Sequence, residues 1–520
     1  MLKNNYTILV SHNNEKMFIL FKSIVVGLAA GGVSVLYRIT LTNAETISNF
    51  TYTFLNQNFM FLPITFLFLI GMGYFVGYLV DKNKMISGSG IPQLEGILKG
   101  YFKSRKSWMH TLISKFVGGA IAIVAGLSLG REGPSIQLGA CIAEGVGNKI
   151  GKGRLEKRIL MASGASAGLA AAFNAPMAGV IFALEEIFKY FSPIILLSTI
   201  SAAVTADFIS KKVFGMNPVF NFPVSQTVPL NGYLMLIFLG IVLGISGAIY
   251  NYTLFKTQKF YKKLTFLNIR TKIIIPFILA GFLGLVFPLA TGGGHKIIEY
   301  LNLKNGISFL VLILIVKFIF SMLSFASGAP GGIFFPLLIL GATIGSIFGH
   351  VMIGNGIFDE SLFNNFIILA MAGYFTAIVR APITGIVLIM EMTGSFNHLL
   401  SLTVVSITAY IVAELLNSPP VYDKLLDNLI VQEHPEDEKE HINKILVEII
   451  VQHDSVFENS LVKDLHWPGK SLLVAIKRGE VELIPKGDTK IMVGDYLVVL
   501  TDINCESKIR EKLEKLNLRP

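Results

Sequence analysis

The sequence is poor in charge and nearly free of cysteine, and each shortage narrows its class. Charged residues make up 15% of the 520 residues, while hydrophobic residues make up 52%. Because a soluble protein carries about 25% charge, this composition indicates an integral membrane protein. The two cysteines, Cys141 and Cys505, lie far apart, which argues against a disulfide framework or a cysteine metal site.

The histidine and charge patterns argue against two further kinds of site. None of the nine histidines has metal-ligand spacing such as H-E-x-x-H, so we expect no metal, no cofactor and solvated side chains at His434, His441 and His453. The formal net charge of +10 comes from basic clusters beside apolar segments, which fits a membrane protein better than nucleic-acid binding. These clusters lie at residues 99–106, 149–158 and 256–272. The positive-inside rule places them in the cytoplasm, and we expect both termini there too.

Several uncharged stretches are long enough to span a bilayer. These candidates are Phe59–Val80, Val228–Phe255 and Ile273–Thr291. Two further stretches are interrupted, Phe318–Phe358 by glycines and a proline at 328–332, and Ile159–Leu184 by an Asn-Ala-Pro sequence at 174–176. Non-helical backbone at membrane depth is tolerated only inside protein or beside a wet cavity, so these breaks point to an ion or substrate site.

An internal repeat relates the two interrupted regions. Each contains, in order, G-x-x-x-P, then A-P-x-x-G, then glutamate. The corresponding residues are Gly130, Pro134, Ala175, Pro176, Gly179 and Glu185 in the first copy, and Gly332, Pro336, Ala381, Pro382, Gly385 and Glu391 in the second. The pattern predicts a transporter of two similar halves, about 15–215 and 229–417, with its site between them. Their relative orientation stays open, because only an odd number of crossings per half would invert them.

Three Gly/Pro breaks each place a proline where a helix can start. They are Gly88-Ser89-Gly90-Ile91-Pro92, Gly130-Arg131-Glu132-Gly133-Pro134 and Gly332-Ile333-Phe334-Phe335-Pro336. Taken singly, each could be a helix-packing kink. If they converge, their free N–H groups and helix dipoles would form an anion site without a full side-chain cation, so the anion could still be released.

Glu132 is the most informative residue of these breaks. It follows a run without ionisable side chains, Phe116–Gly130, and a carboxylate at membrane depth costs roughly 2.5–3.5 kcal/mol. With a proline expected at the first helical position, the carboxylate would lie at the positive end of a helix. It can occupy that position itself or leave it to a mobile anion.

Together, the three breaks resemble the signatures of the CLC family of chloride channels and proton-coupled chloride exchangers. The resemblance covers most of residues 15–430 and includes Gly164–Glu186 and Arg380–Thr393. It implies an all-α multi-pass membrane protein, a CLC-type inverted repeat with broken helices. It also implies a homodimer in a bacterial inner (plasma) membrane, with a separate ion pathway in each subunit.

The resemblance also assigns roles to residues. Ser89 and Tyr422 resemble the serine and tyrosine whose hydroxyls contact the central anion, and Ile333 and Phe334 would offer backbone N–H groups. Glu132 resembles the external glutamate that competes with chloride and carries protons. Without the family context, Ser89 would be a helix cap and Tyr422 an interfacial anchor.

Glu186 distinguishes exchangers from channels in this family. It resembles the internal proton glutamate of the exchanger branch, and a carboxylate in apolar surroundings can exchange protons near neutral pH. The alternative is a carboxylate at the membrane surface near Lys189. Glu185 could be its partner or a structural residue, and the repeat mate Glu391 could likewise cap or pair buried groups. Gln93 departs from close bacterial relatives, which often have glutamate there; this weakens any proton role at residue 93.

The composition changes near residue 432. Residues 1–432 form the expected membrane domain, 433–442 a charged linker, and 443–520 a small cytoplasmic α/β domain. The last segment predicts strands and helices in a fixed order. These are a strand at Lys444–Val451, a short helix at Ser460–Leu465, a hairpin of Leu472–Lys477 and Val481–Pro485, a strand at Asp495–Thr501 and a helix at Ser507–Leu516.

This tail resembles the C-terminal ligand-binding domain of potassium-transport regulators. The resemblance lies in Pro485–Thr489 followed by Val493-Gly494-Asp495. It implies a regulatory domain with an unidentified small ligand, whereas the alternative is a dimer-stabilising appendage.

The leading hypothesis is a proton-coupled chloride antiporter, with a passive voltage- or pH-gated chloride channel as the alternative. We expect no enzyme. The sequence Gly164-Ala165-Ser166-Ala167-Gly168 matches the hydrolase elbow G-x-S-x-G, but that motif needs a preceding strand. Here it lies in a small-residue helix pattern, which favours close helix packing.

Overall fold

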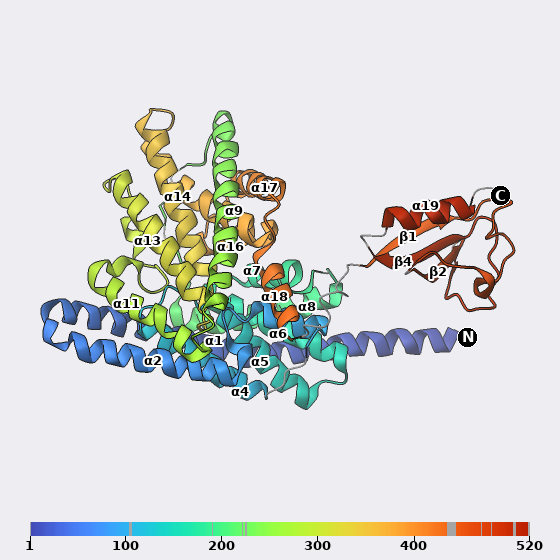
Figure 1. Ribbon diagram of the computed structural model, residues 1–520, viewed down its shortest axis with the longest axis horizontal. Helices are drawn as coiled ribbons and strands as arrows, with labels where there is room; N and C mark the ends of the chain where they lie inside the picture. Colours follow the sequence, from blue (N-terminus) through green and yellow to red (C-terminus); the bar gives the residue numbers. More distant parts are fainter. Residues whose placement is uncertain are drawn as a thin grey trace. The chain divides into compact units, whose positions relative to one another are not determined.

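Long apolar helices make up most of the chain, as the composition predicts (Figure 1). The computed structural model describes residues 2–102, 107–189, 191–220, 222–223, 226–433, 444–469, 471–479, 481–502 and 506–517. It divides into two compact units, Met1–Leu429 and Ile430–Pro520. Here they are called the membrane unit and the tail. The domain boundaries predicted at residues 432 and 443 remain predictions.

The helices of the membrane unit fall into two groups when they are divided at the boundary between the two halves that the sequence predicts. The first has α1 (Leu2–Gln57), α2 (Leu62–Lys82), α3 (Ile91–Lys99), α4 (Trp108–Val124), α5 (Glu132–Ile150), α6 (Arg154–Phe173), α7 (Pro176–Phe182), the π-helical segment η3 (Ala183–Phe188) and α8 (Pro193–Phe214). The second has α9 (Tyr233–Lys263), α10 (Ile269–Lys272), α11 (Ile274–Val286), α12 (Ile297–Tyr300), α13 (Ile307–Ala326), α14 (Phe334–Gly354), α15 (Phe363–Val379), α16 (Pro382–Thr393) and α17 (Leu399–Leu415). α18 (Val421–Glu433) follows.

Eight helical segments among the described residues are long and apolar enough to cross a membrane. The three predicted spans fall on α2, α9 and α11. The prediction for α11 ran too far, since the helix ends at Val286 and not near Thr291. Pro288 accounts for this difference, because it has no N–H to continue the helical hydrogen bonds.

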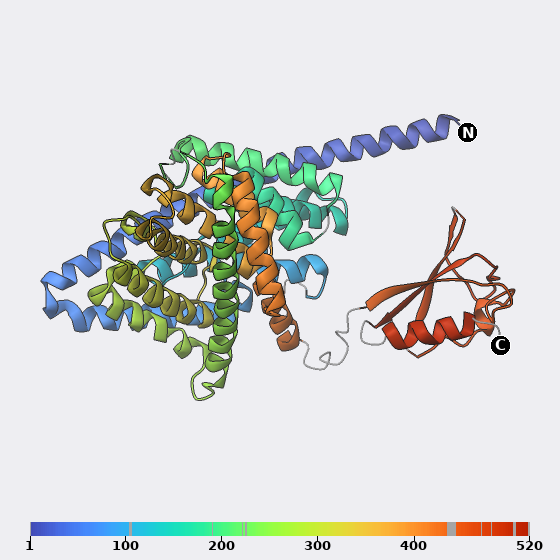
Figure 2. The same ribbon diagram turned by 90° about the horizontal axis from the view of Figure 1, so that it is seen from above.

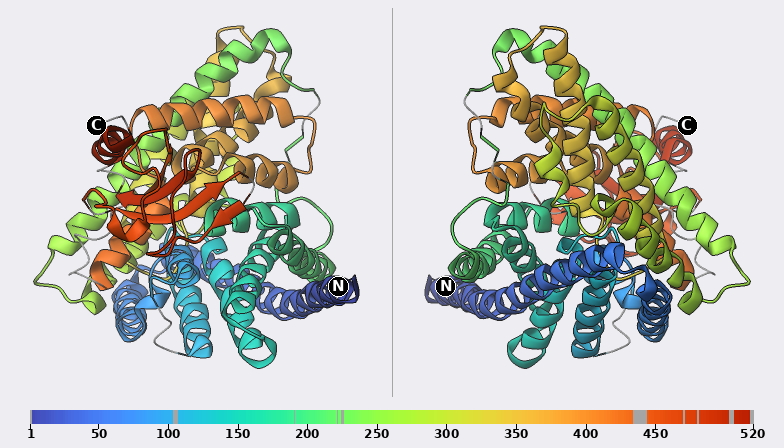
Figure 3. Two further views of the ribbon diagram at one scale, coloured as in Figure 1. Left: turned by 90° about the vertical axis from the view of Figure 1, so that its right-hand side faces the viewer. Right: turned by 90° about the vertical axis from the view of Figure 1, so that its left-hand side faces the viewer.

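The helices differ strongly in burial, which separates the centre of the unit from its lipid-facing rim. In the most apolar window of α15, 94% of the residues are buried, against 17% for α2. The exposed side of α2 carries large apolar side chains such as Leu67 and Phe68, as expected against lipid. Figure 2 and Figure 3 show the same ribbon from three further directions.

The predicted breaks are where the sequence placed them. α6 ends at Phe173 and α7 begins at Pro176, while α13 ends at Ala326 and α14 begins at Phe334. The G-x-S-x-G match lies inside α6, with Ser166 buried, so the packing interpretation is confirmed. A Cβ atom added at Gly139 of α5 would lie 2.1 Å from the Gly164 carbonyl oxygen of α6, which only glycine permits.

The tail is a small α/β domain. Four strands form one antiparallel sheet in the order β1-β4-β2-β3, and α19 (Glu506–Asn517) contacts β1 and β4. The strands are β1 (Lys444–Ile450), β2 (Leu472–Arg478), β3 (Val481–Leu483) and β4 (Tyr496–Asp502). A single helical turn covers Val462–Asp464. The predicted strands and helices are therefore confirmed. Glu480 of the hairpin, and the linker apart from Glu433, lie outside the described residues.

Candidate anion and proton site

The second and third breaks are bonded directly to each other. The Gly130 N–H donates to the Gly332 carbonyl at 2.6 Å, and the Gly332 N–H donates back to the Gly130 carbonyl at 2.8 Å. These two glycines are equivalent in the repeat and form an isolated antiparallel bridge. Because equivalent residues exchange reciprocal bonds, a local two-fold axis passes between them. The two breaks are therefore equivalent in space as well as in sequence.

The first break joins the same cluster. The Gly331 N–H donates to the Gly88 carbonyl at 3.0 Å. A Cβ atom at Gly133 would lie 2.8 Å from the Ser89 Cβ, so the first two breaks are in direct contact. The predicted convergence of the three helix starts is therefore confirmed.

The prolines are not at the predicted helix position. α5 begins at Glu132 and α14 at Phe334, so Pro134 and Pro336 are third in their helices and not first. The first-turn N–H groups of a helix have no intrahelical partner, so a proline is tolerated throughout that turn. Glu132 itself and the Phe334 N–H therefore lie at the N-terminal ends of α5 and α14, where an anion is favoured.

Ser89 is buried at the start of α3. Its Oγ accepts a hydrogen bond from the Ile91 N–H at 3.3 Å, so it does act as a local cap. This bond uses only the oxygen, and the hydroxyl proton remains able to donate to an anion. The cap and the proposed anion ligand are therefore compatible.

Tyr422 belongs to an aromatic cluster with Phe182 and Phe334. Its ring meets Phe182 edge-on at 6.4 Å, and Phe182 lies 6.0 Å from Phe334. Tyr422 is fully buried, and its hydroxyl has no hydrogen-bond partner among the described residues. A buried hydroxyl without a protein partner is suited to a ligand that the protein binds transiently.

Glu132 is fully buried beside the cluster of helix starts. Neither carboxylate oxygen has a hydrogen-bond partner among the described residues, and the nearest cation is Arg131, whose Nε lies 3.9 Å from Oε1. The Phe335 backbone N–H lies close to the carboxylate. The side chain thus occupies space beside the start of α14, where the sequence predicted competition with an anion.

A small cavity outside this carboxylate contains two polar residues that the sequence reasoning missed. Glu45 of α1 and His295 line it together with Glu132 and Phe335. The His295 ring stacks on Phe335 with centroids 4.0 Å apart, and its Nδ1 lies 3.7 Å from a Glu45 oxygen. Glu45 and His295 thus place polar groups beside Glu132, although the two residues are 250 positions apart in the chain.

A fourth break, Gly292-Gly293-Gly294, was also missed. Lys317 of α13 is buried and donates to the carbonyls of Ala290 (3.0 Å) and Gly292 (2.6 Å). Lys115 of α4 does the same for the first break, donating to Ile86 (2.9 Å) and Gly88 (2.5 Å). Each lysine precedes its repeat glycine, Gly130 or Gly332, by the same number of residues, and this spacing could have revealed the pair.

Glu186 lies in the π-helical segment after α7. It is 3% exposed and Oε1 has no hydrogen-bond partner among the described residues, so the surface-carboxylate alternative is wrong. Lys189, Asp423 and Glu95 act on it electrostatically, and Lys189 is itself paired with Asp423. Glu186 therefore lies next to a polar group that ends in half-exposed side chains.

Glu185 and Glu391 have a structural function. Glu185 accepts from the Thr384 N–H at 2.7 Å and caps α16, while Glu391 accepts from the Ala178 N–H at 2.8 Å and caps α7. Each half thus caps a helix of the other half with the same repeat position. This geometry confirms the structural alternative for both residues. Gln93 likewise serves the loop, since its amide donates to the Ser87 carbonyl at 2.8 Å.

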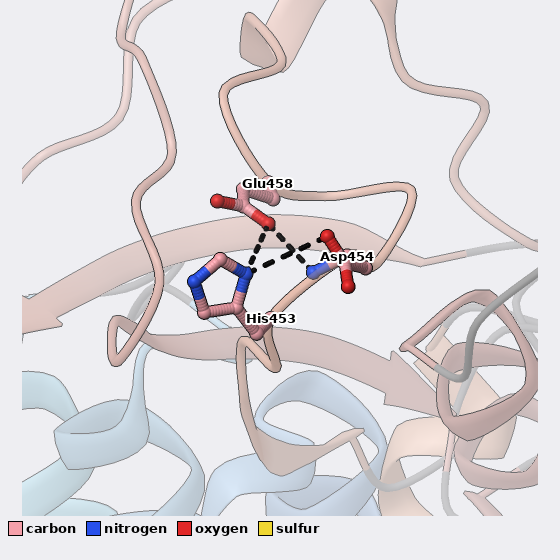
Figure 4. Close-up of side chains that lie close together, drawn as sticks. All are labelled: His453, Asp454 and Glu458. Atoms are coloured by element: carbon pink, nitrogen blue, oxygen red, sulfur yellow. Dashed lines mark hydrogen bonds and ion pairs between the residues drawn. The ribbon is translucent and has the colours of Figure 1, made fainter.

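A group in the tail could by geometry hold a metal ion (Figure 4). His453, Asp454 and Glu458 each offer one ligand atom within 4.8 Å of the others, although no standard ligand spacing marks them in the sequence. Glu458 already accepts the Asp454 N–H at 2.6 Å, and His453 Nδ1 lies 3.2 Å from the same carboxylate. Closure of a surface turn accounts for this arrangement.

The chain matches two family models. Residues 72–414 match the voltage gated chloride channel family, and residues 446–514 match the TrkA-C domain. It is 34% identical over 434 residues to the H(+)/Cl(-) exchange transporter ClcA of Vibrio cholerae, covering 80% of this chain and 91% of that protein. It is 32% identical over 445 residues to ClcA of Salmonella typhi, covering 82% and 92%.

Solved structures agree with these matches. A slow cyanobacterial Cl-/H+ antiporter superposes with a TM-score of 0.74 at 31% identity, covering 80% of this chain and 99% of that one. A CLC-type fluoride/proton antiporter gives a TM-score of 0.65 at 25% identity, covering 78% and 97%. The chain therefore belongs to the voltage gated chloride channel (CLC) family and combines its membrane domain with a TrkA-C domain.

Proposed function

We propose that this protein is a proton-coupled chloride antiporter. The observation that carries the proposal is a pair of buried carboxylates, Glu132 and Glu186, each with an oxygen that has no hydrogen-bond partner among the described residues. Relatives with 32–34% identity are named H(+)/Cl(-) exchange transporters, which supports the same reaction here.

In the proposed cycle the anion occupies the space among the helix starts. Ser89 and Tyr422 donate hydroxyl hydrogens to it, and Ile333 and Phe334 offer backbone N–H groups. Glu132 competes for this space while ionised and leaves it on taking up a proton from the outer side. Glu186 exchanges protons with the cytoplasm through the polar group at Lys189 and Asp423.

The test is flux from proteoliposomes, with chloride and pH recorded together. Wild-type protein should move protons uphill when a chloride gradient is imposed. Glu186→Val should keep chloride flux and abolish proton movement, and Met392→Leu, at the equivalent position of the other half, should keep both. Full proton coupling in Glu186→Val would overturn the assignment of Glu186.

The alternative is a passive chloride channel in which Glu132 only gates. Burial of a titratable group at Glu186 favours the antiporter, because a channel needs no internal proton acceptor. The reversal potential under a proton gradient separates the two, since the potential of a channel would ignore pH.

The family context supports further parts of the proposal. We place the protein in a bacterial inner membrane as a homodimer, with the basic loops and both termini in the cytoplasm. The tail would then be a cytoplasmic domain able to bind a small ligand. Chemical crosslinking of the intact chain in membranes tests the dimer, and protease access from each side tests the orientation.

A further inference from the structure

A wide groove lies between the C-terminal part of α9, from Ile245 onward, and the start of α18, apart from the anion site. Its lining comes from α9, from the turn before α18, and from α18 itself. The lining includes Ile245, Ile249, Tyr252, Lys256, Lys259, Lys262 and Lys424. We call it the α9–α18 groove; Figure 1 labels both helices.

One end of the groove is basic. Lys256, Lys259 and Lys262 line it from α9, and Lys424 lines it from α18. No carboxylate lines it, and none of the four lysines has an ion pair, among the described residues. Lys259 and Lys262 repel each other. Positive charge is common at cytoplasmic helix ends, but here two helices far apart in the chain aim it into one cavity.

The other end is apolar and exposed. Ile245, Ile249 and Tyr252 are 44%, 54% and 66% exposed, although they are large and apolar or aromatic. They continue into Lys256 and Lys259 at steps of three and four residues, so all five share one face of α9. Tyr252 lies at the junction and its ring is 5.5 Å from the Lys256 Nζ.

We propose that the α9–α18 groove is a binding site for an anionic phospholipid. The phosphate headgroup would bind the lysines and an acyl chain would cover the isoleucines. Basic pockets between membrane helices on the cytoplasmic side suit such headgroups. A soluble phosphate, or the acidic linker that follows α18, would satisfy the lysines but leave the apolar end uncovered.

A hydrogen bond from a side chain of α9 also links the groove to the segment that carries Tyr422. The Asn251 side chain of α9 donates to the Pro419 carbonyl at 3.0 Å, directly before the segment that carries Tyr422. Lys424 lies two residues after Tyr422. A headgroup bridging Lys256 and Lys424 would therefore join α9 to the helix that positions Tyr422.

The test measures lipid retained by the full-length protein after reconstitution. Vesicles contain phosphatidylcholine with a minor fraction of phosphatidylglycerol, and native mass spectrometry then counts bound lipids. Wild-type protein should retain phosphatidylglycerol in excess of its bulk fraction. Lys256→Gln/Lys424→Gln should lose roughly tenfold or more of this preference, since each lysine contributes to headgroup attraction. The control, Lys263→Gln/Lys272→Gln, removes the same charge outside the groove and should retain it.

A second arm separates the lipid from a free anion. Ile245→Ser/Ile249→Ser removes the apolar end without changing charge and should also lower phosphatidylglycerol retention. Equal losses in both lysine variants would overturn the proposal, because surface charge alone would explain them. Displacement of the lipid by inorganic phosphate at equal concentration, or full retention in the isoleucine variant, would also overturn it.

Discussion

The two halves of the membrane unit share a backbone frame but differ in chemistry. Gly130 and Gly332 form reciprocal bonds, and the helices that follow them start in the same way. At equivalent positions the first half has Glu132 and Glu186, where the second has Phe334 and Met392. All four side chains are buried.

This difference separates two requirements of the proposed reaction. An anion site built from helix starts needs the frame of both halves, because the proposed donors Ser89, Ile333 and Phe334 lie at the starts of α3 and α14. Proton transfer needs titratable groups, and at these two positions only the first half has them. The second half instead adds aromatic packing. The ring centroid of Phe334 lies 4.7 Å from that of Phe375 and 5.3 Å from that of Phe173.

The largest expected effect comes from removing the Glu132 carboxylate, so that neither half has a titratable group at this position. Glu132→Ala should keep chloride flux, abolish proton movement down to the level of protein-free vesicles, and remove the pH dependence of flux. The reason is that no group would remain to compete with the anion or carry its proton. Paired chloride and pH recordings measure this. Phe334→Leu is the matched control, because it keeps the backbone N–H and should retain coupling; surviving coupling in Glu132→Ala would refute the asymmetry.

The next largest effect concerns the backbone frame that the two halves share. The loss of stability should be equal in both halves. Lys115→Met and Lys317→Met each leave two buried or partly buried carbonyls without their donor, which we expect to cost about 3 kcal/mol. The midpoint of SDS-induced unfolding would measure it. A large loss for one lysine with none for the other would show that the repeat is not equivalent at these loops.

The reciprocal caps should give a smaller change. Glu185→Gln and Glu391→Gln each weaken a charged cap at a helix start, for an expected loss of about 1 kcal/mol each. Proton coupling should persist, since both carboxylates are already bonded to the N–H groups of a helix start. A double-mutant cycle on the same unfolding assay tests additivity, and loss of coupling in either single variant would assign these residues to the proton path instead.

The repeat also explains which features the sequence could predict. Glycine and proline punctuation is local, so the breaks, the helix starts and the mates Glu185 and Glu391 could be found from spacing. Glu45 and His295 could not, because their contact depends on how α1 meets the loop after α11. Lys115 and Lys317 were recoverable from the repeat but are single residues inside apolar helices, where composition alone gives no signal.

The tail lies outside the repeat, so a substitution in the tail should not alter the difference between the two halves. Its Asp495 carboxylate receives two hydrogen bonds at 2.8 Å from Arg478, one to each oxygen, and one from the Met492 N–H. Burial alone would raise the pKa of Asp495, but these bonds outweigh it and the pKa is lowered. A lowered pKa stabilises the fold above the unfolded pKa of about 3.9 and loses that contribution as the pH falls through the folded value.

The smallest expected effect follows from this pair. Asp495→Asn should destabilise the tail by about 1 kcal/mol at neutral pH, since Arg478 is partly exposed and solvent screens the pair. It should also flatten the loss of stability below about pH 4. Trp467, which stacks on Phe457 in the tail, reports unfolding by fluorescence once the other tryptophan is removed as Trp108→Phe. Chloride and proton flux should not change, because the pair contributes no group to either half; altered coupling would instead show that the tail acts on transport.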